Sequence, residues 1–447
     1  MSALLLAVCG ALEDAGVRWC LLCGYETYPD DVDPDDVDLI VSPEQFSLVP
    51  RVLASIPGVW IVQARRHEAT SVRYEILSFT VEGEFVLLGV DVSSEIRDVG
   101  VVLMGADEFL SGRRRFREVF WVPEPALEFA FYTLKKLGKS RHYGAAALLP
   151  EHERVLTRLC RADPAGAEHQ LARFFAPGDV RLLLDAVQSG LWAPVREDLP
   201  RLWRAPARYL IRRAPAAVVR YWVGEIHRRA RRVLAPAGLM VSFFGLDGAG
   251  KSTVIERVKQ DLWQVFSDRE RYHLRPGVCL RINPDRGDAV GAPVPEPARG
   301  LATSVVKLVV WWADYVAGYA VRIFPSLVRT ALVLFDRYYN DVLVDPGRYR
   351  YGGPGWLARR VGRWIPSPAL VFLLDAPPDA LAARCRHVPY GTPELRERYV
   401  RLVSGLPGGQ IIDATRSLDE VVARVERIIF EHMAARMARR LRLEAQA

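Results

Sequence analysis

A glycine-rich loop that directly follows an apolar run is the feature that most constrains how this chain folds. The run Leu239–Phe244 leads into Gly-Leu-Asp-Gly-Ala-Gly-Lys-Ser at residues 245–252, which matches the phosphate-binding pattern Gly-x4-Gly-Lys-Ser. Apolar residues then recur at helical spacing from Val254 to Phe266, so the loop is predicted to lie between a strand and a helix. This order of elements predicts an α/β domain with a nucleoside triphosphate site.

Each residue type in the loop has a physical reason to be there. Glycines allow successive backbone N–H groups to converge on phosphate oxygens at the positive end of the following helix. Lys251 is placed to reach the β- and γ-phosphates, and the hydroxyl of Ser252 is a ligand for Mg²⁺. ATP and Mg²⁺ are therefore the expected cofactors. The predicted nucleotide-binding residues are Gly245, Asp247, Gly248, Ala249, Gly250, Lys251, Ser252 and Thr253.

Composition limits the remaining classes of protein. A chain of 447 residues is expected to form two or three domains. The net charge of +7 comes almost entirely from arginine, which we interpret as a compositional bias, so a nucleic-acid partner is not favoured. Six cysteines in a chain of this length do not form a disulfide framework, which indicates a reducing, cytoplasmic environment.

Three parts are expected along the chain: residues 1–120, a helical connector at 121–235, and an α/β domain at 236–447. In the first part, helix and strand patterns alternate, which is typical of an α+β domain. From residue 236 onward, strands and helices alternate as in a parallel sheet covered by helices. The strands predicted in the first part are Val17–Gly24, Val37–Val41, Val59–Gln63, Val72–Phe79 and Phe85–Val92.

Beyond the loop, residues 238 to about 435 resemble thymidylate kinases and related nucleoside monophosphate kinases. The resemblance rests on the loop itself, on Phe335-Asp-Arg-Tyr338 after an apolar run, and on the strand-like segment Leu370–Pro378. The segment Ile411–Ala414, followed by a helix from Leu418, also fits. The resemblance implies a P-loop kinase fold and a Mg²⁺-dependent phosphotransferase.

The resemblance also implies roles for individual residues. Arg337 takes the position of the arginine that binds the acceptor's phosphate, Asp336 the position of the aspartate beside the metal, and Asp247 that of an acidic residue facing the acceptor. The mobile arginine lid of these kinases corresponds to Arg384, Arg386, Arg396 and Arg398. The predicted catalytic residues are Lys251, Asp336, Arg337, Arg384 and Arg386.

The residues that would recognise the acceptor depart from the thymidylate kinase pattern. The segment Tyr339–Tyr349 replaces the stretch that helps recognise thymine, and 273–277 replaces an Arg-Glu-Pro-Gly-Gly loop. The chain is thus similar to divergent thymidylate-kinase-like proteins that are often encoded beside surface-polysaccharide genes. The expected acceptor is a small molecule: a sugar, a sugar phosphate or a nucleotide. Candidate acceptor contacts are Asp341, Asp345, His273 and Arg275.

Two other functions stay open at this point. The first is an authentic dTMP kinase. The second is a regulatory or nucleic-acid-binding protein that binds nucleotide without turnover.

One segment, Leu301–Phe324, is apolar enough to suggest a membrane span, but Lys307, Asp314 and Arg322 interrupt it. Charges at the centre of a bilayer cost about 2.5–3.5 kcal/mol each on insertion scales. A helix buried inside the kinase domain is therefore predicted, with Asp314 near the substrate cleft.

The first part carries a second motif. Gly24-Tyr25, followed after a turn by residues 36–41, Asp-Val-Asp-Leu-Ile-Val, resembles the active-site signature of the DNA polymerase β-like nucleotidyltransferase fold. Because alternate residues of a strand face the same side, Asp36 and Asp38 can share a metal pair, with Asp91 as the third carboxylate. Both a catalytic and a degenerate version of this domain are consistent with the sequence. The lysines at 135, 136 and 139 are expected on a solvated helix face, and the alternative is that they supply charge to the nucleotidyltransferase cleft.

The stretch 201–232 is rich in arginine interleaved with aromatic residues, and three interpretations apply. A helical brace between domains is favoured. A peripheral contact with an anionic membrane comes second, and a nucleic-acid patch third. A homodimer is also left open.

Overall fold

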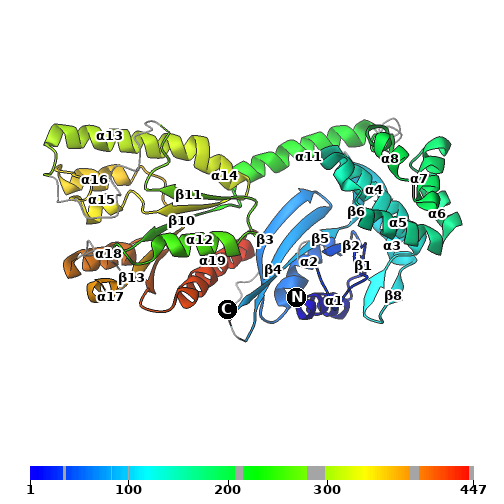
Figure 1. Ribbon diagram of the computed structural model, residues 1–447, viewed down its shortest axis with the longest axis horizontal. Coiled ribbons are helices and arrows are strands. Elements are labelled where there is room, and N and C mark those ends of the chain that lie inside the picture. The colour runs from blue at the N-terminus through cyan, green and yellow to red at the C-terminus, as the bar shows by residue number, and fades with distance from the viewer. Residues whose placement is uncertain are drawn as a thin grey trace. The chain divides into compact units, whose positions relative to one another are not determined.

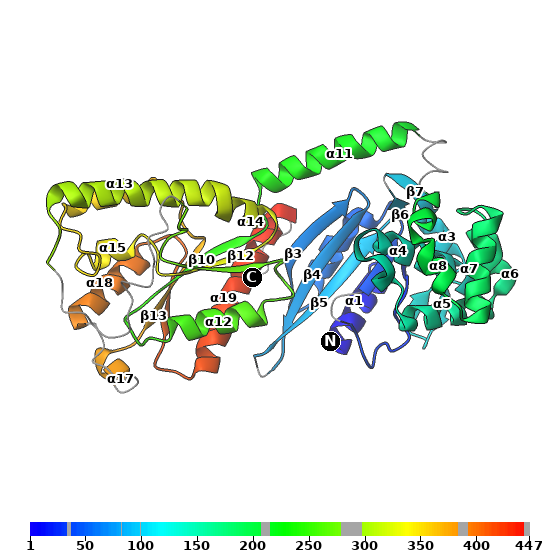
Figure 2. The ribbon, with the colours of Figure 1, turned by 45° about the horizontal axis from the view of Figure 1, so that its top comes forward.

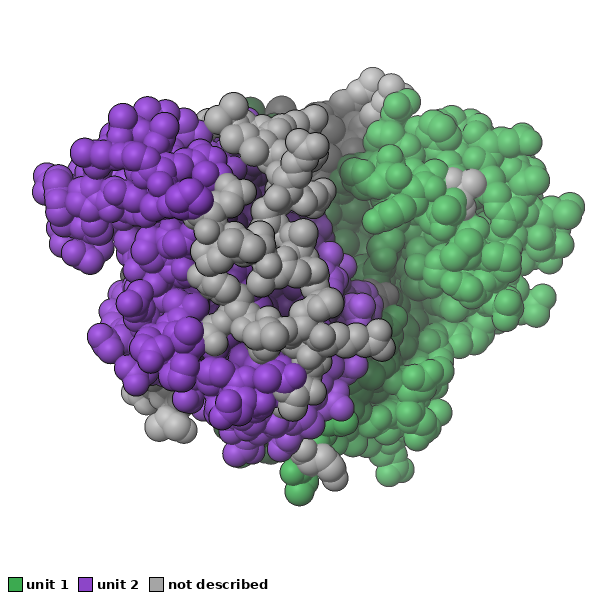
Figure 3. All heavy atoms as spheres, turned by 60° about the vertical axis from the view of Figure 1, so that its left-hand side comes forward, with its two compact units in different colours: residues 1–228, 434–447 green, residues 229–433 purple. Residues whose placement is uncertain are grey.

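Two compact units make up the chain in the computed structural model, which describes residues 1–33, 37–81, 83–98, 100–206, 215–278, 297–382 and 392–441. The first unit contains Met1–Arg228 and Ala434–Ala447, and the second contains Arg229–Met433 (Figure 3). This division differs from the three parts expected from the sequence. The helices between residues 125 and 202 share one hydrophobic core with Cys20, Leu22 and Ile40, so this part of the expected connector belongs to the first unit.

A five-stranded sheet forms the centre of the first unit (Figure 1). Its order is β1-β2-β5-β4-β3, with β2 and β5 parallel and the other neighbours antiparallel. The helices α1 (Ser2–Asp14) and α2 (Val49–Ser55) contribute to its core. All five strands were predicted, within a few residues at their ends. They are β1 (Trp19–Leu21), β2 (Val37–Val41), β3 (Val59–Glu68), β4 (Ser71–Phe79) and β5 (Phe85–Ser93).

Two small two-stranded sheets and a helical layer complete the first unit. The short elements before the helices are η1 (Phe46–Leu48), β6 (Glu95–Asp98), β7 (Val101–Gly105), α3 (Ala106–Ser111), β8 (Arg114–Phe116) and β9 (Phe120–Val122). The helices are α4 (Pro125–Tyr143), η2 (Gly144–Ala147), α5 (Pro150–Ala162), α6 (Pro164–Leu171), α7 (Pro177–Ser189), α8 (Ala193–Glu197) and α9 (Leu199–Leu202). A long helix, α11 (Pro215–Leu234), follows and crosses the division between the units.

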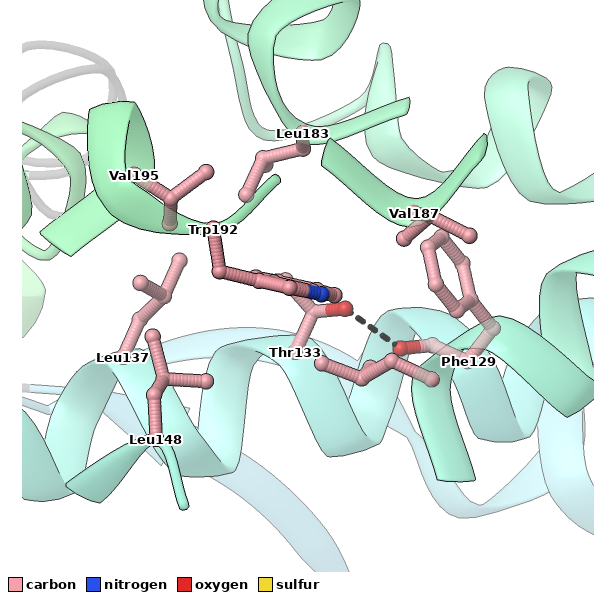
Figure 4. A pocket seen from close by; sticks show the side chains of 9 residues that line it. Phe129, Thr133, Leu137, Leu148, Leu183, Val187, Trp192 and Val195 are labelled. Carbon is pink, nitrogen blue, oxygen red and sulfur yellow. Dashed lines mark hydrogen bonds between the residues drawn. The ribbon is translucent and has the colours of Figure 1, made fainter. Parts of the chain in front are cut away.

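The helical layer encloses a small apolar cavity. Its lining includes Phe129 and Thr133 from α4, Leu183 from α7, and Trp192 (Figure 4). The hydroxyl of Thr133 donates to the carbonyl oxygen of Phe129 at 2.8 Å, which satisfies its hydrogen-bonding need. No charged residue lines this cavity, so we interpret it as imperfect packing and not as a functional site.

A parallel five-stranded sheet forms the centre of the second unit, as the strand–helix alternation predicted. Its order is β11-β12-β10-β13-β14, with every neighbouring pair parallel. The central strands are buried along their length because helices cover both faces of the sheet. The strands are β10 (Leu239–Phe244), β11 (Arg269–His273), β12 (Leu332–Asp336), β13 (Leu370–Asp375) and β14 (Gly409–Asp413).

The covering helices divide between the two faces of this sheet. In both ribbon views, α13 and α14 lie on one side, and α12 and α19 on the other (Figures 1 and 2). The bounds are α12 (Lys251–Asp261), α13 (Leu301–Gly318), the π-helical η4 (Tyr319–Ile323), α14 (Phe324–Val328), α15 (Asp341–Val344), α16 (Gly355–Gly362), α17 (Pro378–Ala382), α18 (Pro393–Ser404) and α19 (Leu418–Leu441).

The apolar helix around α13 is only partly a core helix. Within the described residues it runs continuously over Leu301–Val328, and it is long and apolar enough to cross a bilayer. Only 33% of its most apolar window is buried, which is less than expected of a core helix. Asp314 lies on the buried side, whereas Val306, Val309 and Trp312 are exposed. The prediction of a helix buried inside the kinase domain therefore holds for the face that carries Asp314, and not for the face that carries Val306, Val309 and Trp312.

Candidate active site

The phosphate-binding loop connects β10 to α12, as predicted. Three of its glycines adopt backbone angles that other residues rarely take, with φ of +147° at Gly245, +85° at Gly248 and +84° at Gly250. A Cβ atom at Gly245 would lie 2.6 Å from the carbonyl oxygen of Leu374 on β13. The loop ends at the first turn of α12, whose N–H groups lack intrahelical partners and are suited to bind phosphate.

Lys251 is buried inside this loop. Its Nζ donates to the carbonyl oxygens of Gly245 and Leu246, each at 3.0 Å. Burial and the positive charge of Arg337 lower the pKa of Lys251 from 10.5 to about 8. A bound triphosphate would offer this ammonium group anionic partners in place of neutral carbonyls, which would favour its charged form.

A serine hydroxyl and a carboxylate meet next to the loop. The Oγ of Ser252 donates to Oδ2 of Asp336 at 2.8 Å, and Nη2 of Arg271 donates to the same oxygen at 2.8 Å. Burial acts to raise the pKa of Asp336, but the charge of Lys251 and the two hydrogen bonds outweigh it and lower the pKa. An ionised carboxylate beside a hydroxyl is a pair of hard oxygen donors and fits Mg²⁺. Arg271, on β11, was not predicted because no motif marks it.

Arg337 is buried at the end of β12, in the left-handed region with φ of +70°. Its Nη1 donates to Asp341 at 2.8 Å, and its Nη2 donates to Asp247 at 2.5 Å. Asp341 is fully buried and also accepts hydrogen bonds from the hydroxyls of Tyr349 and Tyr399. Asp341 therefore holds Arg337 in place, and its direct contact with the acceptor stays a prediction.

The carboxylate of Asp247 bridges two guanidinium groups. Oδ1 accepts from Arg337, and Oδ2 accepts from Nη1 of Arg348 at 2.9 Å. Burial favours the neutral acid, but the two arginines outweigh it and lower the pKa of Asp247. Arg348 was missed by the sequence analysis because it lies 101 residues from Asp247 in a segment without a recognisable motif.

The other candidate acceptor residues lie around this centre. His273 ends β11 and is the register partner of Asp336. The guanidinium of Arg275 lies 5.2 Å from the ring centroid of Trp311 and 3.8 Å from a carboxylate oxygen of Asp314. Oδ1 of Asp345 accepts from the backbone N of Arg348 at 3.1 Å, which fixes the turn that carries this arginine.

Asp314 anchors the chain between β11 and α13. Its two carboxylate oxygens accept from the backbone N atoms of Gly277 and Val278, at 3.0 and 2.6 Å. Its role in the structure is therefore to hold the segment after β11.

Part of this chain is similar to known proteins. No family model matches the chain. A probable thymidylate kinase from Methanosarcina mazei is 27% identical over 208 residues, which are 43% of this chain and 96% of that protein. A thymidylate kinase from Xanthomonas oryzae pv. oryzae is 28% identical over 216 residues, 46% of this chain and 88% of that protein.

Between 43 and 46% of the chain is homologous to thymidylate kinases. This homology supports the classification of the chain as a phosphotransferase. Among solved structures, the thymidylate kinase of Ehrlichia chaffeensis aligns with 43% of this chain and all of its own, with a TM-score of 0.32 and 17% identity.

The predicted arginine lid is described only in part. Arg384 and Arg386, the two predicted catalytic residues of the lid, lie outside the described residues. Arg396, on α18, donates through Nε and Nη2 to the two carboxylate oxygens of Asp375, both at 2.7 Å. Arg398, on the same helix, is exposed. The predicted role of the lid therefore stays a prediction.

In the first unit, the sheet brings together two of the three predicted metal ligands. Asp38 on β2 and Asp91 on β5 are register partners in the parallel pair, so their side chains emerge on the same face. Burial and the negative charge of Asp38 raise the pKa of Asp91 to about 6. Asp36 lies outside the described residues.

Cations of the protein itself lie against both carboxylates. Lys135 on α4 donates to Asp38, which corrects the expectation that this lysine lies on a solvated face. The Nη1 of Arg73 donates to Asp91 at 3.0 Å, and Nε2 of His67 lies 3.6 Å from the same carboxylate. Within the described residues, no group of three or more His, Cys, Asp or Glu side chains is arranged to hold a metal ion. Both carboxylates of this pair are thus already engaged in ion pairs within the protein.

Proposed function

We propose that the P-loop unit transfers a phosphoryl group from ATP to a small acceptor that itself carries a phosphate group. The observation that carries the proposal is the bridge from Arg337 through Asp247 to Arg348, next to the phosphate-binding loop. The homology to thymidylate kinases supports the reaction class, and the bridge supports the acceptor class.

The donor side follows from the loop. The glycine conformations and the N-terminus of α12 favour binding of the triphosphate, and Lys251 supplies positive charge to the transferring group. When Mg²⁺ is bound, Ser252 and Asp336 would hold it, and the ion would neutralise charge on the phosphates. No covalent intermediate is required, because positioning and electrostatic stabilisation suffice for phosphoryl transfer.

The residues around Asp247 favour an acceptor that reacts through a phosphate group over one that reacts through a hydroxyl group. A hydroxyl acceptor needs a base to take up its proton. The carboxylate of Asp247 has a lowered pKa, and both of its oxygens accept hydrogen bonds from arginines. A phosphate monoester is already charged at neutral pH and needs cations instead. Arg337 and Arg348 supply two guanidinium groups whose fork geometry suits phosphate.

The residues that follow Tyr338 bear on the identity of the acceptor. The relatives are named thymidylate kinases, but here this segment contains Asp341 and Tyr349, which together hold Arg337, and Arg348, which reaches Asp247. We therefore infer a nucleotide or sugar phosphate other than dTMP as acceptor.

Matched pairs of acceptors test the proposal. ADP formation and the mass of the product are measured with nucleoside monophosphates and hexose phosphates, and with the same compounds lacking phosphate. Two charge-assisted hydrogen bonds, at about 1.5 kcal/mol each, predict a preference of about 100-fold in kcat/KM for the phosphorylated compounds. Equal turnover of the unphosphorylated partners would contradict the assignment.

The other sequence-based expectations stay predictions. They are nucleotidyl transfer by the first unit, nucleotide binding without turnover, a homodimer and a cytoplasmic location.

A further inference from the structure

The helix α11 exposes the face that a surface helix usually buries. An amphipathic helix normally buries its apolar face and exposes its polar one. In α11 the apolar side chains are exposed, and a polar face packs on the first unit.

The apolar face is continuous along the helix. With 3.6 residues per turn, positions 219, 222, 223, 226 and 233 fall on one side. The exposed fractions of the apolar side chains on and beside this stripe range from 47 to 84%. They are Val219, Trp222, Val223, Ile226, Val233 and Leu234.

The opposite side holds the polar residues that pack inward. The side chains of Arg228 and Glu225 are only 12% and 18% exposed and form an ion pair. Burial raises the pKa of Tyr221, and the negative charges of Glu68 on β3 and Glu225 raise it further. Tyr221, Glu225 and Arg228 therefore form the inner face of α11, which makes the orientation of the stripe unambiguous.

The charged side chains of α11 are predominantly positive. Its sequence contains five arginines and one acidic residue, and that acidic residue, Glu225, is already paired with Arg228. Arg220 and Arg231 lie on one flank of the apolar stripe, and Arg229 on the other, as helical spacing dictates. An apolar strip with Trp222 on it and arginines along both flanks combines the two properties that bind a helix to an anionic lipid surface.

We propose that α11 is a membrane-surface helix that binds an anionic lipid bilayer through the stripe formed by Val219, Trp222, Val223 and Ile226. The stripe would insert at the level of the headgroups, with the flanking arginines at the lipid phosphates. A phosphotransferase held in this way would work at the membrane surface. Of the three interpretations of the stretch 201–232, this proposal follows the peripheral contact with an anionic membrane.

The choice of a bilayer over a protein or nucleic acid rests on this combination. The phosphates of a nucleic acid would bind the arginines, but they would not bind a strip of four aliphatic and indole side chains. A second copy of the chain would bring the same positive flanks together, and like charges repel.

The experiment uses the full chain and vesicles of phosphatidylcholine with 30 mol% phosphatidylglycerol, compared with vesicles of phosphatidylcholine alone, in a co-sedimentation assay. We expect binding to the anionic vesicles, weakened by added salt, and at least about tenfold weaker binding to the neutral ones. The double variant Trp222→Glu/Ile226→Glu should lose at least about tenfold in affinity for the anionic vesicles. Its kinase activity in solution and melting temperature should match those of the wild type.

The matched control is Trp263→Glu, which places a carboxylate on another exposed tryptophan, 54% exposed against 52% for Trp222. This variant should bind like the wild type. Failure of the wild type to bind anionic vesicles would overturn the proposal. Retained binding by the double variant would also overturn it and direct attention to the exposed face of α13. A dimer that the double variant dissociates, seen by sedimentation equilibrium without lipid, would identify a second copy as the occupant.

Discussion

At the scale of single residues, the ionisation of Lys251 sets an upper pH limit on activity. Its pKa of about 8 in the free protein means that the side chain loses its charge as pH rises through 8. We expect kcat/KM for ATP to fall about tenfold per pH unit above this value, because kcat/KM reports the free enzyme. The limb in kcat should lie at higher pH, because bound phosphates favour the charged form.

The variant Lys251→Arg is the control for this profile. A guanidinium stays protonated to beyond pH 10, so the limb should vanish even though the rate is lower. A wild-type profile that stays flat to pH 10 would contradict this prediction: either Lys251 keeps its charge in the free protein, or its charge is not needed.

Arg348 is the residue that most directly tests the acceptor site. Arg348→Ala should raise KM for the acceptor by about 10- to 100-fold, because a charge-assisted hydrogen bond contributes about 1.5–3 kcal/mol, and should leave KM for ATP within about twofold. Arg350→Ala, two residues away and bonded to the carbonyl oxygen of Pro297, is the control. Equal effects of the two substitutions would indicate a general disturbance of the loop.

At the scale of elements, the carboxylates on β2 and β5 allow a test of whether the first unit binds a divalent metal ion. Asp38 and Asp91 lie side by side, but each already has an ion-pair partner, Lys135 for Asp38 and Arg73 for Asp91. In the absence of nucleotide, Mn²⁺ should therefore change the melting temperature of the wild type little. Lys135→Met should create a metal-dependent increase, and adding Asp38→Asn should abolish it.

The opposite pattern would reinstate a two-metal site in the first unit. It would consist of a large Mn²⁺-dependent stabilisation of the wild type that Asp38→Asn removes. Thermal unfolding followed by calorimetry distinguishes the two outcomes.

The elements also show what a sequence can and cannot predict. The strand, loop and helix at 239–261 were predicted because their signals are local: glycine spacing and apolar periodicity. The cluster of Arg337, Asp341 and Tyr399 could not be predicted, because α18 brings Tyr399 to it across 58 residues. The sequence showed arginines interleaved with aromatic residues around α11, but only the structure shows which face of this helix is covered.

At the scale of the whole molecule, the two units differ in how far the structure brings together the site residues predicted from the sequence. In the second unit the predicted phosphate-transfer residues lie around the loop. Ser252 donates to Asp336, Lys251 donates to two carbonyl oxygens of the loop, and Arg337 donates to Asp247 of the loop. In the first unit the carboxylates lie together but face cations of the protein. We therefore expect the phosphotransferase activity to depend on the second unit.

Specificity is a property of the whole acceptor region. Because the segment after Tyr338 departs from the thymine-recognition pattern, dTMP should be a poor acceptor even when ATP is saturating. Steady-state kinetics with dTMP should give a kcat/KM at least about tenfold below that of the best phosphorylated acceptor in a panel. Efficient, saturable phosphorylation of dTMP would show that the chain is a thymidylate kinase in activity.

The most direct test of the central claim follows the phosphoryl group itself. The protein is incubated with Mg²⁺, γ-labelled ATP and a fractionated extract of small molecules, and labelled products are identified by mass spectrometry. We predict that the wild type places the label in a product with two linked phosphates. The variant Lys251→Ala should form no labelled product, although it retains a cooperative melting transition that shows it to be folded. Label found only in inorganic phosphate, or equal transfer by the two proteins, would contradict the account.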